Sequence, residues 1–298
     1  MGMVVKSVLS FWGKGGVGKT TISSAFAVAL AERGYSVYLL SSDFMPSLHD
    51  VLEFPLTYEP VKVMDNLVVE QLFEDKIIDL WKKRFGYEVY RVASSIFPVG
   101  PEIIDYVAGA PGIVEEFTLY YIYELSRNLT CDVIVWDTVA TGGGLRMLKI
   151  EKEFYEHLGE AAKLYLKVKG VLDKIRTGSE EPLKLIDSWR LLAQDVLSFL
   201  KNASHFATLV SRPFPIDFQV AVRAYQELSQ FVPMRFLFIN MVSFSGEEKE
   251  YLKKFEETFE GKLDIFRVPR FDTSPRGINA LRKLISEKDL EKIESVVF

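Results

Sequence analysis

The chain has 298 residues, of which 48% are hydrophobic and 26% charged, and its formal net charge is −5. This length suits one large domain or two small ones, and such a core needs no disulfides; the single cysteine, Cys131, could form none within the chain. An acidic balance without a lysine-arginine run disfavours nucleic-acid binding as the main activity. No apolar stretch reaches membrane-spanning length and no signal peptide is recognisable, so we expect a cytoplasmic protein.

Short apolar runs alternate with helical patterns along the chain. The first is a strand at 4–12, followed by a glycine-rich turn, a helix at 20–33 that ends at Gly34, and a strand at 36–41. Further strands are expected at 67–72, 132–136, 206–210, 235–239 and 264–268. This alternation predicts an α/β fold with a mainly parallel central sheet flanked by helices.

Two long stretches depart from the alternation. Residues 73–108 have helical apolar spacing and many aromatics, and residues 151–202 are charged and helical in pattern with a break at 177–179. We expect them to meet as a helical subdomain of a single P-loop domain that covers 1–298. Residues 289–298 have the pattern of an amphipathic helix that lacks the basic face of a membrane anchor.

A phosphate-binding loop follows the first strand. Residues 13–20 read Gly-Lys-Gly-Gly-Val-Gly-Lys-Thr, which matches G-x-x-x-x-G-K-[ST] between a strand and a helix. Glycines let backbone N–H groups approach phosphates, and the helix start presents free N–H groups and the positive end of its dipole. The pattern predicts ATP bound by Gly13, Gly15, Gly16, Val17, Gly18, Lys19, Thr20 and Thr21. Lys19 would contact the β- and γ-phosphates, and the Thr20 hydroxyl would ligate Mg²⁺.

The loop carries a second lysine, Lys14, at a position that the general pattern leaves free, so a surface lysine is one interpretation. The extended string Gly-Lys-Gly-Gly-Val-Gly-Lys-Thr-Thr resembles the deviant P-loop of the family that contains MinD, ParA, the arsenite-pump ATPase and the targeting ATPase for tail-anchored membrane proteins. In that family the extra lysine reaches the nucleotide of a dimer partner. The resemblance therefore implies a homodimer in the ATP state, with Lys14 acting in trans as an arginine finger does.

Asp43 follows the second strand, where ligands of open α/β sheets bind, and a carboxylate there could activate water. A turn or N-cap aspartate is the alternative. The segment Ser-Ser-Asp-Phe-Met-Pro-Ser-Leu resembles the first switch of the arsenite-pump and tail-anchor ATPases, which implies that Asp43 is the water-activating residue. Phe44 and Pro46 replace that family's Pro and His.

Asp137 ends the strand at 132–136, the general form of a magnesium-associated carboxylate. The string Asp-Thr-Val-Ala-Thr-Gly-Gly-Gly-Leu-Arg from Asp137 resembles the second switch of the same two subfamilies. The glycines at 142–144 predict a loop more mobile than is usual there. Thr20, Asp43 and Asp137 are thus the candidate magnesium ligands.

The resemblance extends over residues 4–284. Residues 111–116 resemble the Pro-Gly-x-x-Glu helix start of the family, Asn240 would contact adenine, and the segment from Pro269 would pack on the base. It implies a hydrophobic client or membrane-protein partner at the helical subdomain, although core packing is an equal interpretation of those helices. No Cys-x-x-Cys is present and the three histidines are scattered, so we expect no zinc.

Three other functions remain open. One is a ParA- or MinD-like positioning ATPase on DNA or membrane, which the acidic charge disfavours. The second is a scaffold that binds ATP without hydrolysing it, because the switches are altered. The third is a small-molecule ligase or kinase on the same loop type, such as a biotin-pathway carboxylating enzyme.

Overall fold

The computed structural model describes residues 5–45, 47–172, 181–243 and 246–298. It divides the chain into two compact units. The sheet unit comprises Met1–Phe73, Leu125–Leu145 and Leu200–Phe298, and the helical unit comprises Glu74–Glu124 and Arg146–Phe199.

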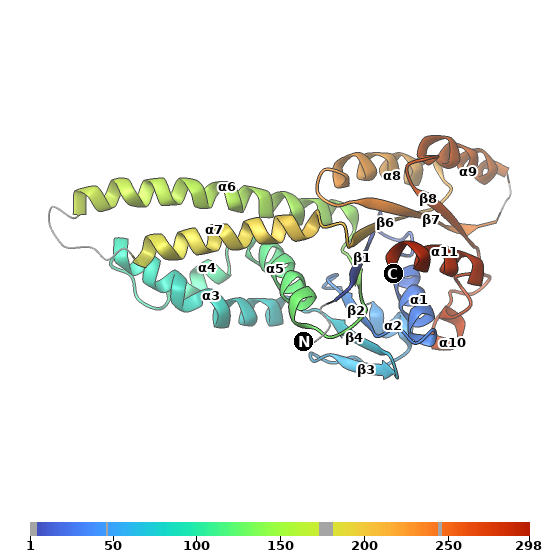
Figure 1. The fold of residues 1–298 in the computed structure, drawn as a ribbon, viewed down its shortest axis with the longest axis horizontal. Coiled ribbons are helices and arrows are strands. Elements are labelled where there is room, and N and C mark those ends of the chain that lie inside the picture. Colours follow the sequence, from blue (N-terminus) through green and yellow to red (C-terminus); the bar gives the residue numbers. More distant parts are fainter. Residues whose placement is uncertain (1–4, 46, 173–180, 244–245) are drawn as a thin grey trace. The chain divides into compact units, whose positions relative to one another are not determined.

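The sheet unit is built on eight strands in the order β3-β4-β2-β5-β1-β6-β7-β8. Seven strands run parallel and β3 at the edge runs antiparallel to β4 (Figure 1). The strands are β1 (Ser7–Trp12), β2 (Val37–Ser41), β3 (Val61–Met64), β4 (Leu67–Gln71), β5 (Val133–Asp137), β6 (His205–Ser211), β7 (Met234–Val242) and β8 (Asp264–Pro269). The predicted α/β fold with a mainly parallel sheet is confirmed.

Helices cover both faces of this sheet. On one face α1 (Lys19–Glu32), α2 (Leu48–Leu52), α10 (Ile278–Leu281) and α11 (Glu287–Val297) share one buried core with alternate strand residues such as Leu9, Phe11 and Leu39. α8 (Pro215–Leu228) packs on β6 and against α9 (Gly246–Phe259), for example through Phe218 and Phe255. Right-handed crossovers place these two groups of helices on opposite faces of the sheet. The chain moves toward the β3 edge from β1 to β2 and toward the β8 edge from β6 to β8.

The central strands are apolar on both faces, as parallel strands buried under helices must be. All six residues of β1 and all five of β2 and of β5 are buried. The register aligns Asp137 with Phe11 of β1 and with Ser41 of β2, so three strands end together at one edge of the sheet. This edge carries the phosphate loop.

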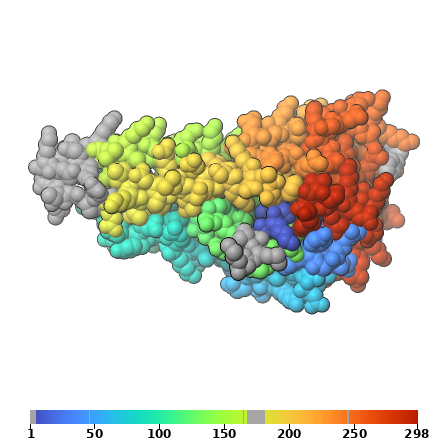
Figure 2. All heavy atoms as spheres, in the orientation of Figure 1, coloured from blue at the N-terminus to red at the C-terminus, as the bar shows by residue number. Residues whose placement is uncertain are grey.

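The helical unit contains α3 (Glu74–Ile96), α4 (Ile103–Ala108), most of α5 (Ile113–Asn128), and most of α6 (Thr141–Leu172) and α7 (Glu181–Leu200). Phe85 of α3 packs edge-on against Phe117 of α5, and Lys82 pairs with Asp105 of α4 at 2.7 Å. Helices α6 and α7 share a small apolar cluster, and Figure 2 shows their side chains adjacent on the surface.

Several sequence expectations change in detail. The helical unit includes α5, which the two predicted helical stretches omit, and β3 was not predicted. The predicted glycine loop at 142–144 is wrong, since these residues form the first turn of α6. The helix there is held by tight packing: a Cβ on Gly144 would lie 2.6 Å from Cζ3 of Trp12. The predicted break at 177–179 lies outside the described residues.

Candidate functional site

The phosphate loop has two positions that only glycine can fill. A Cβ on Gly13 would lie 2.3 Å from the Val210 carbonyl oxygen, and one on Gly18 would lie 2.3 Å from Nδ2 of Asn240. Gly18 also has φ +92°, a left-handed conformation that glycine adopts without strain. Gly15 and Gly16 are exposed, so the outer face of the loop is open to a ligand.

Helix α1 begins directly after this loop with no compensating acid. No described side chain caps its N-terminus, and its first turn contains no Asp or Glu. The first N–H groups of the 14-residue helix are therefore available to an anion, and its dipole favours one. Together with the glycine cradle, this arrangement fits a bound phosphate chain.

Thr20, Ser41 and Asp137 converge at the carboxyl ends of β1, β2 and β5. The Thr20 hydroxyl donates to Oδ2 of Asp137 at 2.8 Å, and the Ser41 hydroxyl donates to the same oxygen at 3.1 Å. Asp137 is fully buried, and its other oxygen, Oδ1, has no hydrogen-bond partner among the described residues. An orphaned carboxylate oxygen beside a P-loop hydroxyl suits Mg²⁺, which uses few protein ligands and keeps several waters.

The charged groups of this cluster shift one another's pKa values. Burial raises the pKa of Asp137 to about 6, while hydrogen bonds from Thr20 and Ser41 and the charge of Lys19 oppose the rise. Lys19 is 7% exposed, and burial lowers its pKa, against the attraction of Asp137 and Asp43. The buried Lys19 ammonium could bind a triphosphate, and the unpaired Oδ1 of Asp137 could bind the metal that accompanies it.

Asp43 stands at the start of the loop after β2 and is partly exposed. Its Oδ1 accepts a hydrogen bond from the Met45 backbone N–H at 3.1 Å, and its own carbonyl accepts one from Gln71 at 2.7 Å. These bonds are those of a turn aspartate. Its charge also raises the pKa of Lys19 in the phosphate loop, against the effect of burial.

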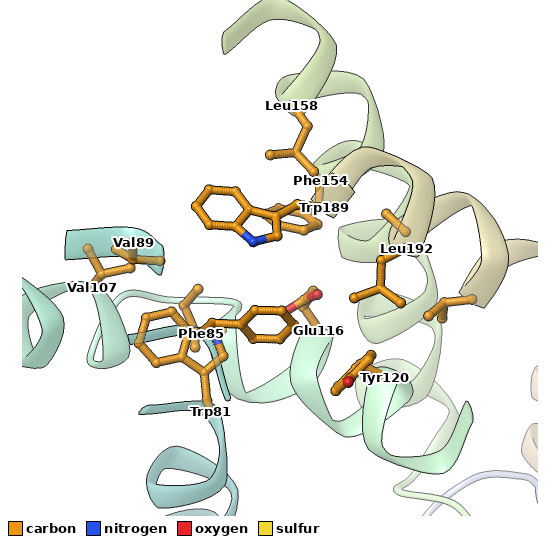
Figure 3. Close-up of a pocket in the computed structure, with 13 residues that line it drawn as sticks. Trp81, Phe85, Val89, Val107, Glu116, Tyr120, Phe154, Leu158, Trp189 and Leu192 are labelled. Atoms are coloured by element: carbon orange, nitrogen blue, oxygen red, sulfur yellow. The ribbon is translucent and has the colours of Figure 1, made fainter. Parts of the chain in front are cut away.

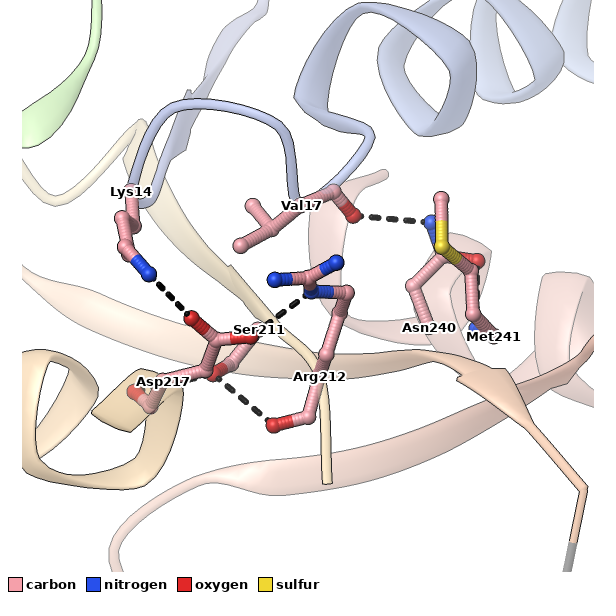
Figure 4. A network of polar contacts seen from close by, with 7 residues as sticks. All are labelled: Lys14, Val17, Ser211, Arg212, Asp217, Asn240 and Met241. Carbon is pink, nitrogen blue, oxygen red and sulfur yellow. Dashed lines mark hydrogen bonds and ion pairs between the residues drawn. The ribbon is translucent and has the colours of Figure 1, made fainter. Parts of the chain in front are cut away.

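Lys14 is engaged within its own chain. Its Nζ forms an ion pair with Oδ1 of Asp217 at 2.8 Å, and Arg212 Nε binds the other oxygen, Oδ2, at 2.7 Å (Figure 4). The Asp217 side chain is 1% exposed, whereas the side chains of Lys14 and Arg212 are 37% and 31% exposed. The lysine is therefore held at the surface by a buried carboxylate on α8.

Asn240 binds the backbone of the phosphate loop. Its Nδ2 donates to the Val17 carbonyl at 2.9 Å, and its Oδ1 accepts from the N–H of Met241, also at 2.9 Å (Figure 4). Met241 has φ 59°, in the left-handed region. The structure thus places Asn240 against the P-loop backbone; its contact with adenine stays a prediction. Pro269 ends β8 in register with Val242, exposed at the same edge of the sheet.

Sequence reasoning missed Asp217 and Arg212 because the two residues belong to no motif and lie some two hundred positions from Lys14. A signal was available: Pro215 and an acid in the first turn indicate a helix start directly after β6. In a parallel sheet that helix start must lie beside the loop after β1, since β1 and β6 are neighbours. The supporting role of Ser41 was also not predicted.

The described residues contain neither a cluster of metal-ligating side chains nor a membrane-spanning helix. Nowhere in 5–45, 47–172, 181–243 and 246–298 do three or more His, Cys, Asp or Glu residues gather into a metal-binding group. Within those same ranges, every helix is too short or too polar to cross a membrane.

Comparison with known proteins agrees with this geometry. Residues 6–288 match the family described as anion-transporting ATPase. The putative arsenical pump-driving ATPase 2 of Aquifex aeolicus (strain VF5) is 31% identical over 264 residues, which are 84% of this chain and 85% of the relative. An ATPase ASNA1 homolog of Babesia bovis is 34% identical over 185 residues, 60% of this chain and 49% of that protein. The chain is an ATPase that belongs to the anion-transporting ATPase family.

Proposed function

We propose that this ATPase works as an ATP-dependent homodimer with Mg²⁺, and that its nucleotide state moves the helical unit and a partner bound there. The observation that carries the proposal is the Thr20–Asp137 hydrogen bond of 2.8 Å beside the orphaned Oδ1 of Asp137. It joins the phosphate loop to the strand that precedes the second switch, as a nucleotide-responsive site requires.

The residues around the phosphates would divide the work as follows. The N–H groups at the start of α1 and the Lys19 ammonium hold the phosphate chain. Thr20, Asp137 and Asp43 would hold Mg²⁺, which when bound neutralises charge on the phosphate oxygens. Asp137 takes part as a carboxylate, and a bound dication would favour that form over the protonated one.

Asp43 would orient and activate the attacking water. Its carboxylate lies close enough to Lys19 to raise the pKa of the lysine ammonium group. Its hydrogen bond with the Met45 backbone N–H uses only Oδ1. A second oxygen therefore remains for water. Because positioned general bases contribute about 10²–10⁴-fold, Asp43→Asn is expected to bind ATP and to lower the turnover number by a factor in that range.

Lys14 would have two positions. In the single chain Asp217 holds it at 2.8 Å, and in the closed dimer it would leave Asp217 for the phosphates of the partner's nucleotide. A cation supplied in trans is worth about 10³–10⁵-fold in turnover in related P-loop enzymes, so Lys14→Ala should lower the turnover number by a similar factor.

Helix α6 offers a route from the phosphates to the helical unit. It begins at Thr141, just after β5 ends at Asp137, and its residues from Arg146 onward belong to that unit. A shift of Asp137 on hydrolysis would be transmitted along one continuous helix. The names of the relatives, arsenical pump-driving ATPase and ASNA1 homolog, support a membrane-protein or hydrophobic client as the partner moved.

The test is ATP hydrolysis per chain across a protein dilution series, with ATP binding measured in parallel. We expect turnover per chain to rise with protein concentration and to be lost in Lys14→Ala while ATP still binds. Lys149→Ala, a change on the exposed face of α6, serves as the control for removal of a lysine. Turnover that is independent of concentration would refute the dimer, and binding without turnover at any concentration would identify a nucleotide-dependent scaffold instead.

A further inference from the structure

The helical unit contains a cavity of about 210 Å³ between its helices. Thirteen side chains line it, contributed by α3, α4, α5, α6 and α7 (Figure 3). Five of them are aromatic: Trp81, Phe85, Tyr120, Phe154 and Trp189. Phe154 and Trp189 are partly exposed, so the cavity is accessible from solvent at that side.

One lining residue, Glu116, is an acid. It is 9% exposed; its backbone N–H donates to the Gly112 carbonyl oxygen at 2.9 Å, and burial alone accounts for the raised pKa of its carboxyl group. Figure 3 shows its carboxyl group among the rings of the cavity rather than turned outward. A carboxyl group in such apolar surroundings destabilises the empty pocket unless a partner binds it.

A second buried acid lies near the first. Glu151 of α6 is fully buried, and neither carboxylate oxygen has a partner among the described residues. It is close enough to Glu116 for their charges to interact. An anion would keep both acids protonated and gain no ion pair from them, whereas a cation gains one from an ionised Glu116, so this pair of acids favours a cationic occupant.

The remaining chemistry of the cavity favours a cation with an apolar body. Aromatic faces attract ammonium groups, and a carboxylate forms a charge-assisted hydrogen bond with them. The volume exceeds the roughly 150 Å³ of an engineered apolar cavity that binds benzene, so one ring with a short side chain fits. We propose that this pocket binds a small apolar amine, with its body against the aromatic walls and its ammonium group on Glu116.

Binding must be accompanied by a proton balance. Burial raises the pKa of Glu116, so the free pocket holds a neutral carboxyl at pH 7. An incoming ammonium ion leaves Glu116 as a carboxylate, and one proton departs to solvent. Titratable groups near the pocket include Glu151 and Tyr120, which accepts from Arg84 at 3.2 Å. They also include Glu88, which accepts from Trp189 at 2.6 Å, and Glu124, whose charge acts on Tyr120.

The experiment is calorimetric titration of the full chain with 2-phenylethylamine and with 2-phenylethanol, a neutral probe of the same shape. We expect the amine to bind at least about tenfold more tightly than the alcohol, since a charge-assisted bond is worth about 1.4 kcal/mol or more. Near pH 7, titrations in two buffers of different ionisation enthalpy should show about one proton released per amine. This second readout needs no variant.

Matched variants locate the ammonium. Glu116→Gln should reduce amine affinity to that of the alcohol and abolish proton release, whereas Glu153→Gln, an exposed acid of α6, should change neither. Equal binding of both probes to the unaltered chain would overturn the proposal and indicate an apolar site, such as a receptor for a client side chain. Binding of neither probe, or amine binding without proton release, would overturn it as well. ATP turnover is not used as a readout, so the result is independent of the proposed ATPase cycle.

Discussion

The two buried acids of the helical unit make the stability of the protein fall as the pH rises. Burial raises the pKa of Glu116 to about 8, and burial together with the charge of Glu116 raises that of Glu151 to about 9, from an ordinary value of 4.5. Both groups are neutral in the folded chain at pH 7 and ionised in the unfolded chain. The unfolded state therefore binds fewer protons above pH 4.5, and the free energy of unfolding declines until the folded pKa is reached.

A window from about pH 6.5 to about pH 8 isolates these acids. In the folded chain burial raises the pKa of Asp137 to about 6 and lowers that of His205 to about 4, so both groups have titrated for the most part below this window. His205 of the unfolded chain titrates near its ordinary value of 6.5, and this contribution cancels when a variant is compared with the unaltered chain. As the pH rises, each neutral buried glutamate lowers the free energy of unfolding by about 1.4 kcal/mol per pH unit, or by about 2 kcal/mol across the window. Glu151→Gln removes one of the two contributions.

The assay is urea unfolding followed by circular dichroism at both ends of the window. The unaltered chain should lose about 3–4 kcal/mol in unfolding free energy and Glu151→Gln about 2 kcal/mol. Glu153→Gln, exposed on the same helix, should behave as the unaltered chain. An equal loss in the unaltered chain and in Glu151→Gln, or no loss in either, would show that Glu151 is ionised in the folded protein and would refute the reasoning.

Two further predictions concern the phosphate loop. Gly18→Ala should weaken ATP binding by at least about tenfold, because the new Cβ would meet Nδ2 of Asn240 at 2.3 Å in addition to about 1–2 kcal/mol of left-handed strain. Gly34→Ala has a similar φ of +93° but open space around it, so it should cost the strain alone and leave ATP affinity, measured by calorimetry, unchanged. Asp217→Asn should free Lys14 and shift the protein concentration for half-maximal turnover about tenfold lower, since a charge-assisted bond of about 1.4 kcal/mol no longer competes. An unchanged concentration dependence in that variant would mean that Asp217 does not restrain Lys14.

The sequence alone determined the sheet unit and its phosphate loop. Buried parallel strands must be apolar on both faces, so seven of the eight strands were recognisable from runs of adjacent residues. The glycines, Lys19 and Thr20 also lie within one short segment, where the strand before and the helix after them specify the geometry. Local chemistry was sufficient to recognise these features, because apolar strand runs and a contiguous phosphate-binding motif are both visible in short segments.

Tertiary structure alone decided which distant residues meet. The pairing of Lys14 with Asp217 depends on β1 lying beside β6, and the aromatic cavity depends on five helices that approach through side-chain packing. The glycines after Asp137 illustrate the same limit. Their local preference is for a loop, but the fit of Gly144 against Trp12 and the hydrogen bonds of a long helix outweigh that preference. Contacts between residues far apart in the chain carry no periodic signal, and so only the folded molecule reveals them.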